Sequence, residues 1–529
     1  MEQGRFVYGI DLGTTYSCIA QIDKFDQPVV LRNFEGDSIT PSVVYFEDRD
    51  NIIVGKEAKG MLATEPENTV VFVKREMGND ASFDKNANHF PYHYDPSEIS
   101  AFILKKLVDD ANQQNKTDTK DVVITCPAYF GTKERMQTKQ AGEIAGLNVI
   151  SIINEPTAAA IAYGVKQQGK SSFIVYDLGG GTFDVTYLVA NKGEIEVIAT
   201  GGDHHLGGVD WDTKMAKYLL TAFNDANGTT YELEDDPVLY NQLILEAENK
   251  KKLLTAKSSI KWNFSYKGKN IRTEITQEKF DNITSDLLDQ TIDAMFDVLD
   301  VAARKGFNTF DEILLVGGSS RMPQVKARID QEFGCDSRLN DPDEIVAKGA
   351  AIFAMNTVYL KEKDLFSKGL SKSRPKPIEK NLAKVVNVTS KTYGKRMVYG
   401  DTGELHIHNF LFANTPLPCS RTVHGSTVYD NQQNIESVIY ESDLTDPVND
   451  ENVPLECGIL IDERVLKLTQ NFPKGTPSLS EFYVNEEGIL SVHFKVGNDS
   501  LDYTLQLKGV KSSKEIAASK AMVASKTIQ

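Results

Sequence analysis

The chain has 529 residues, of which 40% are hydrophobic and 25% are charged, and its formal net charge is −17. This length leaves room for about three or four compact units, and the composition of a globular protein excludes global disorder. The acidic balance argues against sequence-independent nucleic-acid binding, because such binding needs clustered lysine and arginine side chains.

Neither targeting signals nor paired cysteines are found in the sequence. No run of about 18 apolar residues predicts a membrane-spanning helix, and the first residues lack a basic segment followed by an apolar one. The five cysteines lie far apart and form no C-x-x-C pair, which argues against zinc sites and disulfides. We therefore expect a cytoplasmic protein that binds neither membranes nor nucleic acids.

Residues 5–360 alternate strand-like and helix-like segments, which is typical of an α/β fold. Short apolar runs that end at Gly, Pro or Asp predict buried strands at 6–10, 122–125, 173–176 and 313–316. Apolar residues at helical spacing predict helices at 96–114 and 284–303.

The rest of the chain differs in composition. Residues 361–384 are rich in Lys, Ser, Gly and Pro, which predicts a linker. Alternating apolar runs separated by turn clusters predict an all-β module over 385–510. Residues 511–529 are rich in Ala, Lys and Ser, and they predict one short helix that would be marginal alone in water.

One motif occurs twice. The segment Asp11-Leu-Gly-Thr-Thr returns as Asp177-Leu-Gly-Gly-Gly-Thr, each time after a predicted strand and before another. Glycines let the backbone approach an anion closely, successive N–H groups hold phosphate oxygens, and the carboxylate suits hydrated Mg²⁺. The alternative is two ordinary Asp/Gly turns, since short motifs often match by chance.

Two further Gly-rich segments have different interpretations. Gly164 to Ser171 fits the P-loop pattern, but a helix-like stretch precedes it and a strand follows, the reverse of what the motif needs, so we predict a surface loop. Gly317 and Gly318 lie between a strand and a helix, where a base or ribose has room and Arg321 can stack on it. A plain turn between strand and helix is the alternative.

Five motifs together resemble the 70-kDa heat-shock chaperone family, within the actin/hexokinase-type ATPases. They begin at Asp11, Cys126, Ile153, Asp177 and Leu315, and they occur in the family's order. The resemblance is strong over about 5–357 and weaker over 386–510. It implies a two-lobed, actin-like α/β ATPase domain with ribonuclease H-like subdomains, followed by an all-β sandwich of the substrate-binding type. The implied division is an ATPase domain at 1–361, a linker at 362–386, a β sandwich at 387–510 and a short tail or helix stub at 511–529.

The resemblance also implies roles for individual residues, with ATP or ADP, Mg²⁺ and potassium as cofactors. The catalytic residues are Lys74, Glu155, Asp177 and Thr182, which position the attacking water and the metal's waters. The nucleotide-binding residues are Gly13, Thr14, Thr15, Tyr16, Gly179, Gly180, Gly181, Glu248, Lys251, Lys252, Thr255, Gly318, Ser319, Arg321 and Asp343. Asp11 and Asp177 hold Mg²⁺ through water, and Tyr16 and Asp184 lie near potassium.

The sequence also departs from the family's pattern. Ser151 replaces an arginine that serves contact with J-domain co-chaperones, and the acidic, Leu-rich linker is absent, so we expect weak J-domain stimulation. Lys395 and Gly425 occupy positions that are apolar in the family's peptide pocket, and the long helical lid is missing. A lysine buried in such a pocket costs desolvation unless it is paired.

We therefore predict a chaperone-type ATPase that couples slow, Mg²⁺-dependent ATP hydrolysis to binding of unfolded polypeptides, with a nucleotide-exchange factor as a further partner. The alternative is an ATP-binding co-chaperone or scaffold whose altered β module docks one particular protein. A small-molecule kinase or a filament-forming actin relative is disfavoured, because neither needs the appended β module.

Overall fold

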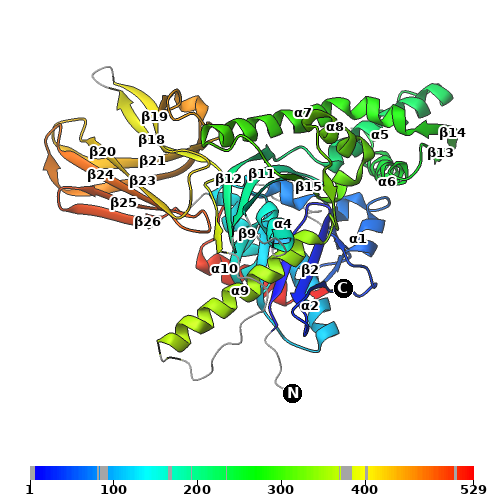
Figure 1. Cartoon of the computed structure of the whole chain (residues 1–529), viewed down its shortest axis with the longest axis horizontal. Coiled ribbons are helices and arrows are strands. Elements are labelled where there is room, and N and C mark those ends of the chain that lie inside the picture. Colours follow the sequence, from blue (N-terminus) through cyan, green and yellow to red (C-terminus); the bar gives the residue numbers. More distant parts are fainter. Residues whose placement is uncertain are drawn as a thin grey trace.

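The computed structural model describes residues 6–79, 83, 93–164, 170–191, 193–233, 235–368, 370, 384–399, 403–505 and 509–529. In Figure 1 an α/β part lies beside an all-β part, whose strands are coloured yellow to orange. Residues 165–169 and 371–383, which hold most of the predicted surface loop and much of the predicted linker, lie outside the described residues. Among the helices described, none has the length and apolarity needed to cross a membrane.

The α/β part contains two large sheets of matching design. In order across the first sheet lie β3 (Pro28–Val30), β2 (Tyr16–Ile22), β1 (Tyr8–Asp11), β8 (Asp121–Cys126) and β9 (Asn148–Asn154). In order across the second lie β12 (Glu194–Asp203), β11 (Phe183–Asn191), β10 (Lys170–Leu178), β15 (Glu312–Val316) and β16 (Arg338–Leu339). In both sheets the first three strands are antiparallel and the last two are added in parallel. The four predicted buried strands are confirmed as β1, β8, β10 and β15.

Helices cover both sheets and separate them. The first sheet packs against α2 (Pro96–Asn115) and α3 (Thr132–Ile144), and the second packs against α7 (Gln277–Arg304). The predicted helix at 96–114 is confirmed as α2. The predicted helix at 284–303 begins seven residues earlier, because the side chain of Thr276 caps the N–H of Lys279.

Two helices cross between the sheets at very short range. They are α4 (Glu155–Gly164), on the second sheet, and α9 (Ile345–Ser367), on β1 and β2. A Cβ at Gly349 would lie only 1.7 Å from the carbonyl oxygen of Ala158, and one at Gly9 would lie 2.1 Å from the amide nitrogen of Ala351. The two glycines therefore set how closely α9 approaches α4 and β1.

Smaller elements complete the two halves, which we call the first lobe (the first sheet, with α2 and α3) and the second lobe (the second sheet, with α7). The first lobe adds β4 (Thr40–Pro41), α1 (Lys56–Met61) and a small sheet with β5 (Val44–Phe46), β6 (Asn51–Val54) and β7 (Thr69–Val70). The second lobe adds α5 (Gly208–Asn227), α6 (Pro237–Leu254), β13 (Ser259–Tyr266), β14 (Lys269–Thr276) and α8 (Pro323–Phe333).

The predicted all-β module is a sandwich of two sheets. The first contains β22 (Asn452–Val453), β19 (Glu404–Leu411), β18 (Thr392–Tyr399), β21 (Gln432–Ser442) and β23 (Ile459–Phe472). The second contains β20 (Cys419–Ser426), β24 (Pro477–Val484), β25 (Leu490–Val496) and β26 (Asp499–Thr504). Alternate side chains point inward and form one apolar core, including Tyr393, Ile439, Phe482 and Phe494.

The sandwich is docked on both lobes. Its entering strand, β17 (Lys384–Val386), lies parallel to β12 and extends the second sheet. On the first lobe, the hydroxyls of Thr132 and Tyr393 share a hydrogen bond of 2.8 Å. On the second, the N–H of Thr200 donates to Oδ1 of Asn414 at 2.8 Å. The β module therefore bridges the two lobes.

The segment after the sandwich packs back onto the first lobe. The predicted short helix is confirmed as α10 (Ser513–Ala524), which buries Val523 in the core of that lobe and donates from Ser519 to Glu98 at 2.6 Å. A strand that the sequence did not predict, β27 (Thr527–Ile528), pairs in parallel with β6. The tertiary contacts stabilise a helix that would be marginal alone.

Candidate functional site

A cavity of about 390 Å³ lies between the two lobes, within the size range of ligand pockets. It brings together most residues that the resemblance assigns to nucleotide binding and catalysis. Those lining it are Asp11, Gly13, Thr14, Thr15, Tyr16, Lys74, Glu155, Asp177, Gly179, Gly180, Thr182, Glu248, Lys251, Lys252, Thr255, Gly318, Ser319, Arg321 and Asp343. Gly181 and Asp184 are not part of its lining.

The repeated Asp/Gly hairpins meet tip to tip at this cavity. The first turn follows β1 and the second joins β10 to β11. A Cβ at Gly180 would lie 2.1 Å from Oγ1 of Thr15, and one at Gly181 would lie 2.3 Å from Cγ2 of Thr14. Gly181 therefore lies at the contact between the tips, where any larger side chain would separate the two lobes.

A buried cluster of charged groups lies at the ends of the strands. Burial and the nearby Glu155 carboxylate raise the pKa of Asp11 to about 7, and the same two causes raise the pKa of Asp177. Burial and Glu155 also raise the pKa of Asp184, which accepts the N–H of Ala128 at 2.8 Å behind the cavity. Among the described residues, these three aspartates and Glu155 thus lie around one lysine.

That lysine is Lys74, which is buried and lies 2.5 Å from Oε1 of Glu155. Burial alone would lower the pKa of Lys74, but Glu155 and Asp11 raise it above its usual value, so the ammonium stays charged. A left-handed turn at Phe72 (φ 58°) starts the short 3₁₀ helix Val73–Glu76 that aims Lys74 inward. The arrangement places a fixed positive charge beside the phosphate-type turns.

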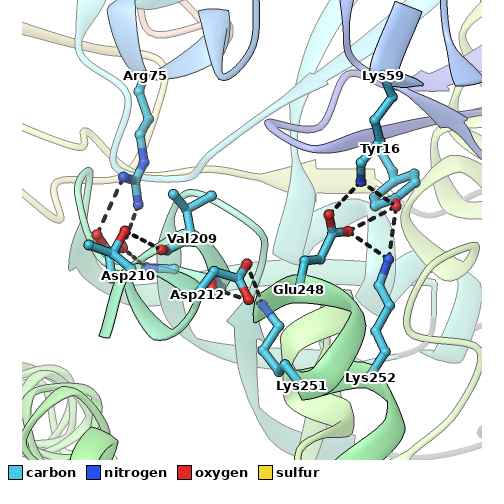
Figure 2. A network of polar contacts seen from close by, with 12 residues as sticks. Tyr16, Lys59, Arg75, Val209, Asp210, Asp212, Glu248, Lys251 and Lys252 are labelled. Carbon is cyan, nitrogen blue, oxygen red and sulfur yellow. Dashed lines mark hydrogen bonds and ion pairs between the residues drawn. The ribbon is translucent and has the colours of Figure 1, made fainter. Parts of the chain in front are cut away.

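A clamp of polar side chains that line the cavity joins the two lobes (Figure 2). Lys59 of the first lobe and Lys252 of the second each lie 2.6 Å from the carboxylate of Glu248, and both donate to the hydroxyl of Tyr16 at 2.8 Å. Burial would raise the pKa of Glu248, but the two lysines lower it to about 2. Lys59 was not predicted, because no local pattern ties it to a partner 189 positions away.

Two more contacts that sequence reasoning missed lie beside the clamp. Arg75 of the first lobe binds Asp210 of the second at 2.5 Å and donates to the carbonyl of Gly181. Lys251 pairs with Asp212 at 2.8 Å; burial nevertheless raises the pKa of that carboxyl to about 6. Figure 2 shows that Arg75 and Lys59 reach down from one lobe while their acidic partners lie on the other.

The far side of the cavity contains the Gly pair after β15. Gly317 has φ 80°, and a Cβ there would lie 2.4 Å from the carbonyl oxygen of Leu178, so the turn packs directly on β10. The guanidinium of Arg321 is held by Asp343, with Nη2 at 2.6 Å from Oδ2. This fixes a flat cationic surface at the edge of the cavity, as stacking on a base requires.

Comparison with known proteins gives consistent matches. The family described as Hsp70 protein matches residues 7–527. Proteins described as "Chaperone protein DnaK" from Thermotoga petrophila and Thermotoga maritima are 36% identical over 507 residues, which cover 93% of this chain and 79% of theirs. The protein of the same description from Thermotoga neapolitana is also 36% identical, with the same coverage of both chains.

Proposed function

The chain belongs to the Hsp70 family, so it is a chaperone that binds and hydrolyses ATP with Mg²⁺, and we propose how its own residues divide this work. The observation that carries the proposal is the tip-to-tip meeting of the two Asp/Gly hairpins beside the buried Lys74–Glu155 pair. Such a site can hold a polyphosphate from two sides, and phosphoryl transfer depends mostly on positioning and charge neutralisation.

The charge of the site fits Mg²⁺. Burial raises the pKa of Asp11, Asp177 and Asp184, so their ionised forms lack a compensating positive charge, and hard cations with retained waters prefer carboxylate oxygens. We place Mg²⁺ beside Asp11 and Asp177; when bound, it neutralises charge on the phosphate oxygens. The potassium proposed near Tyr16 and Asp184 would depend mainly on Asp184, because the Tyr16 hydroxyl contacts Lys59 and Lys252.

Lys74 and Glu155 are the proposed catalytic pair. The carboxylate of Glu155 accepts from Lys74 and has capacity left to orient a water molecule. The ammonium of Lys74 holds that water and stabilises negative charge on the transferred group. Asp177 and Thr182, on either side of the second Gly turn, position the water from the other lobe.

The clamp is proposed to control nucleotide release. Replacing Glu248 by glutamine removes the charge that both Lys59 and Lys252 bind. We expect ADP to dissociate about tenfold faster, which corresponds to a loss of about 1.4 kcal/mol in the free energy that holds it. Stopped-flow release of a fluorescent ADP analogue measures the rate. Glu246→Gln, on the same helix and paired with Lys250 at 3.2 Å, is the matched control. An unchanged release rate in Glu248→Gln would show that the clamp does not control nucleotide release.

The β module is proposed to bind polypeptide through a pocket altered by Lys395. Its side chain is 8% exposed, donates to Oγ of Ser480 at 2.7 Å and lies over the ring of Phe494 at 4.3 Å. Burial lowers the pKa of Lys395 to about 8. Nearby, a Cβ at Gly425 would lie 3.0 Å from Oγ of Ser478 and 3.8 Å from Cε of Met397, so glycine contributes no apolar side chain between them. These features favour a weaker preference for apolar peptides than the family's pocket implies.

The proposal is tested by ATP turnover of the whole chain with and without an unfolded apolar peptide. We expect peptide to stimulate turnover, and Lys395→Ile to raise the peptide's affinity about tenfold because an apolar wall replaces a buried cation. Lys495→Ile, on the exposed side of β25, is the control. Turnover that does not respond to peptide in either protein would contradict coupling between the β module and the ATPase site.

The remaining assignments are proposals of the same kind. We propose the division into 1–361, 362–386, 387–510 and 511–529, and ribonuclease H-like subdomains in the ATPase domain, supported by the two sheets of equal strand order. A nucleotide-exchange factor is the proposed further partner. A cytoplasmic location is supported by five free cysteines.

A further inference from the structure

Two carboxyl groups face each other across the junction between the first lobe and the β sandwich. Glu134 belongs to α3 and Glu441 to β21. A Cβ built at Gly131 would lie 3.0 Å from the Oε2 atoms of both side chains. Both Oε2 atoms are inaccessible to solvent and have no hydrogen-bond partner among the described residues. Neither group belongs to the ATPase site.

Most of the charged side chains around this pair bind other groups. The guanidinium of Arg135 donates to Oδ1 of Asn154 and to the carbonyls of Ala128 and Phe130. Lys391 is bound to Asp443 at 2.5 Å. The other titratable groups around the pair are Lys133 on α3, Tyr393 on β18 and His204 after β12. Tyr393 shares its hydroxyl with Thr132, and burial lowers the pKa of His204 to about 3, so its ring is neutral.

We propose that docking of the β sandwich on the first lobe takes up one proton, which Glu134 and Glu441 share across the junction. Two ionised carboxylates buried around the same glycine repel, whereas a protonated carboxyl can donate to an ionised partner. The proton thus converts a repulsive contact into a hydrogen bond between the domains. The domain junction is therefore a place where pH acts.

The direction of the pH effect follows from the two states. In the docked state burial and the adjacent Glu134 raise the pKa of Glu441 to about 8. In the undocked state Glu441 is exposed and titrates near its usual value of 4.5. Below that value both states carry the proton and pH has no effect. Between the two values only the docked state keeps it, so docking weakens about tenfold for each unit of pH rise, and above about 8 the loss is complete.

The experiment measures docking in the full chain by small-angle X-ray scattering at constant ionic strength, between about pH 6 and 9, with ADP and with ATP. We expect the docked fraction of the unaltered chain to fall as pH rises, with a slope near one proton. The variants Glu134→Gln and Glu441→Gln supply a permanent donor of the same shape, so they should remain docked and lose the slope. Glu143→Gln on α3 and Glu436→Gln on β21 are matched controls that should keep it.

Three results would overturn the proposal. The first is a docking equilibrium of the unaltered chain that does not change with pH. The second is a slope that survives in both glutamine variants. The third is recovery of docking at alkaline pH on addition of millimolar Mg²⁺ or Ca²⁺. That result would show that a cation, and not a proton, lies between the two carboxyl groups. Because docking is measured directly, the result does not depend on ATP hydrolysis or peptide binding.

Discussion

Replacing Lys74 by alanine is expected to lower the rate of ATP turnover by at least about a hundredfold while ADP affinity stays within a few-fold. The side chain is buried at 2.5 Å from Glu155 and, among the described residues, is the cation within the cluster of Asp11, Asp177, Asp184 and Glu155. Its loss removes the charge that holds the attacking water, but it leaves the Gly turns that hold the nucleotide. Single-turnover hydrolysis and equilibrium ADP titration separate the two effects.

Stability must be followed in the same experiment, because removing one partner of a buried ion pair costs about 3–5 kcal/mol. The double variant Lys74→Ala/Glu155→Gln removes both charges and should recover part of the lost stability without recovering turnover. Lys105→Ala, a partly exposed lysine on α2 that pairs with Asp109, is the control for a general charge effect. Turnover near that of the unaltered chain in Lys74→Ala would refute the catalytic role.

Replacing Gly349 by alanine is expected to lower the free energy of unfolding by at least about 3 kcal/mol, at the upper end of the cost of overpacking. The new methyl group would lie 1.7 Å from the carbonyl oxygen of Ala158, which is main chain and cannot rotate away. Helices α4 and α9 must therefore separate, and they lie between the two lobes. Denaturant unfolding measures the loss through Trp211 and Trp262, both buried in the second lobe.

Gly60→Ala is the matched control. Gly60 lies within the short helix α1, and apart from its chain neighbours and the backbone of that helix no atom lies within 4 Å of its Cβ position, so alanine there should be neutral or stabilise by up to about 1 kcal/mol. Equal stability of the two alanine variants would show that the α4–α9 contact tolerates an added methyl group, contrary to the geometry.

The parts of the molecule that were predicted from the sequence are those encoded locally. The buried strands, α2, the two Asp/Gly turns and the alternating strands of the β module each carry their own pattern of apolar and turn residues. For these elements a few neighbouring residues are enough to predict the structure, because the sequence pattern covers the same residues as the element that it forms.

Contacts between distant segments were not predictable in this way. The clamp residue Lys59, the Arg75–Asp210 bridge and the Glu134–Glu441 pair each join elements from different parts of the fold. A single sequence gives the charge of each side chain but not which opposite or like charge the fold places beside it. The strand β27 has two residues, too few to show an alternating period.

The pairing of β27 with β6 has a consequence for the order of assembly during synthesis. Residues 527 and 528 form the edge strand of a sheet whose other strands lie within residues 44–70. The ribosome releases those early strands long before their partner exists, so β6 has an unpaired edge while most of the chain is made. The lobe that is translated first is therefore the last to be completed. Until then the edge of β6 is open to pairing with a neighbouring chain, and a binding factor that covers it would have to leave before residues 527 and 528 can pair.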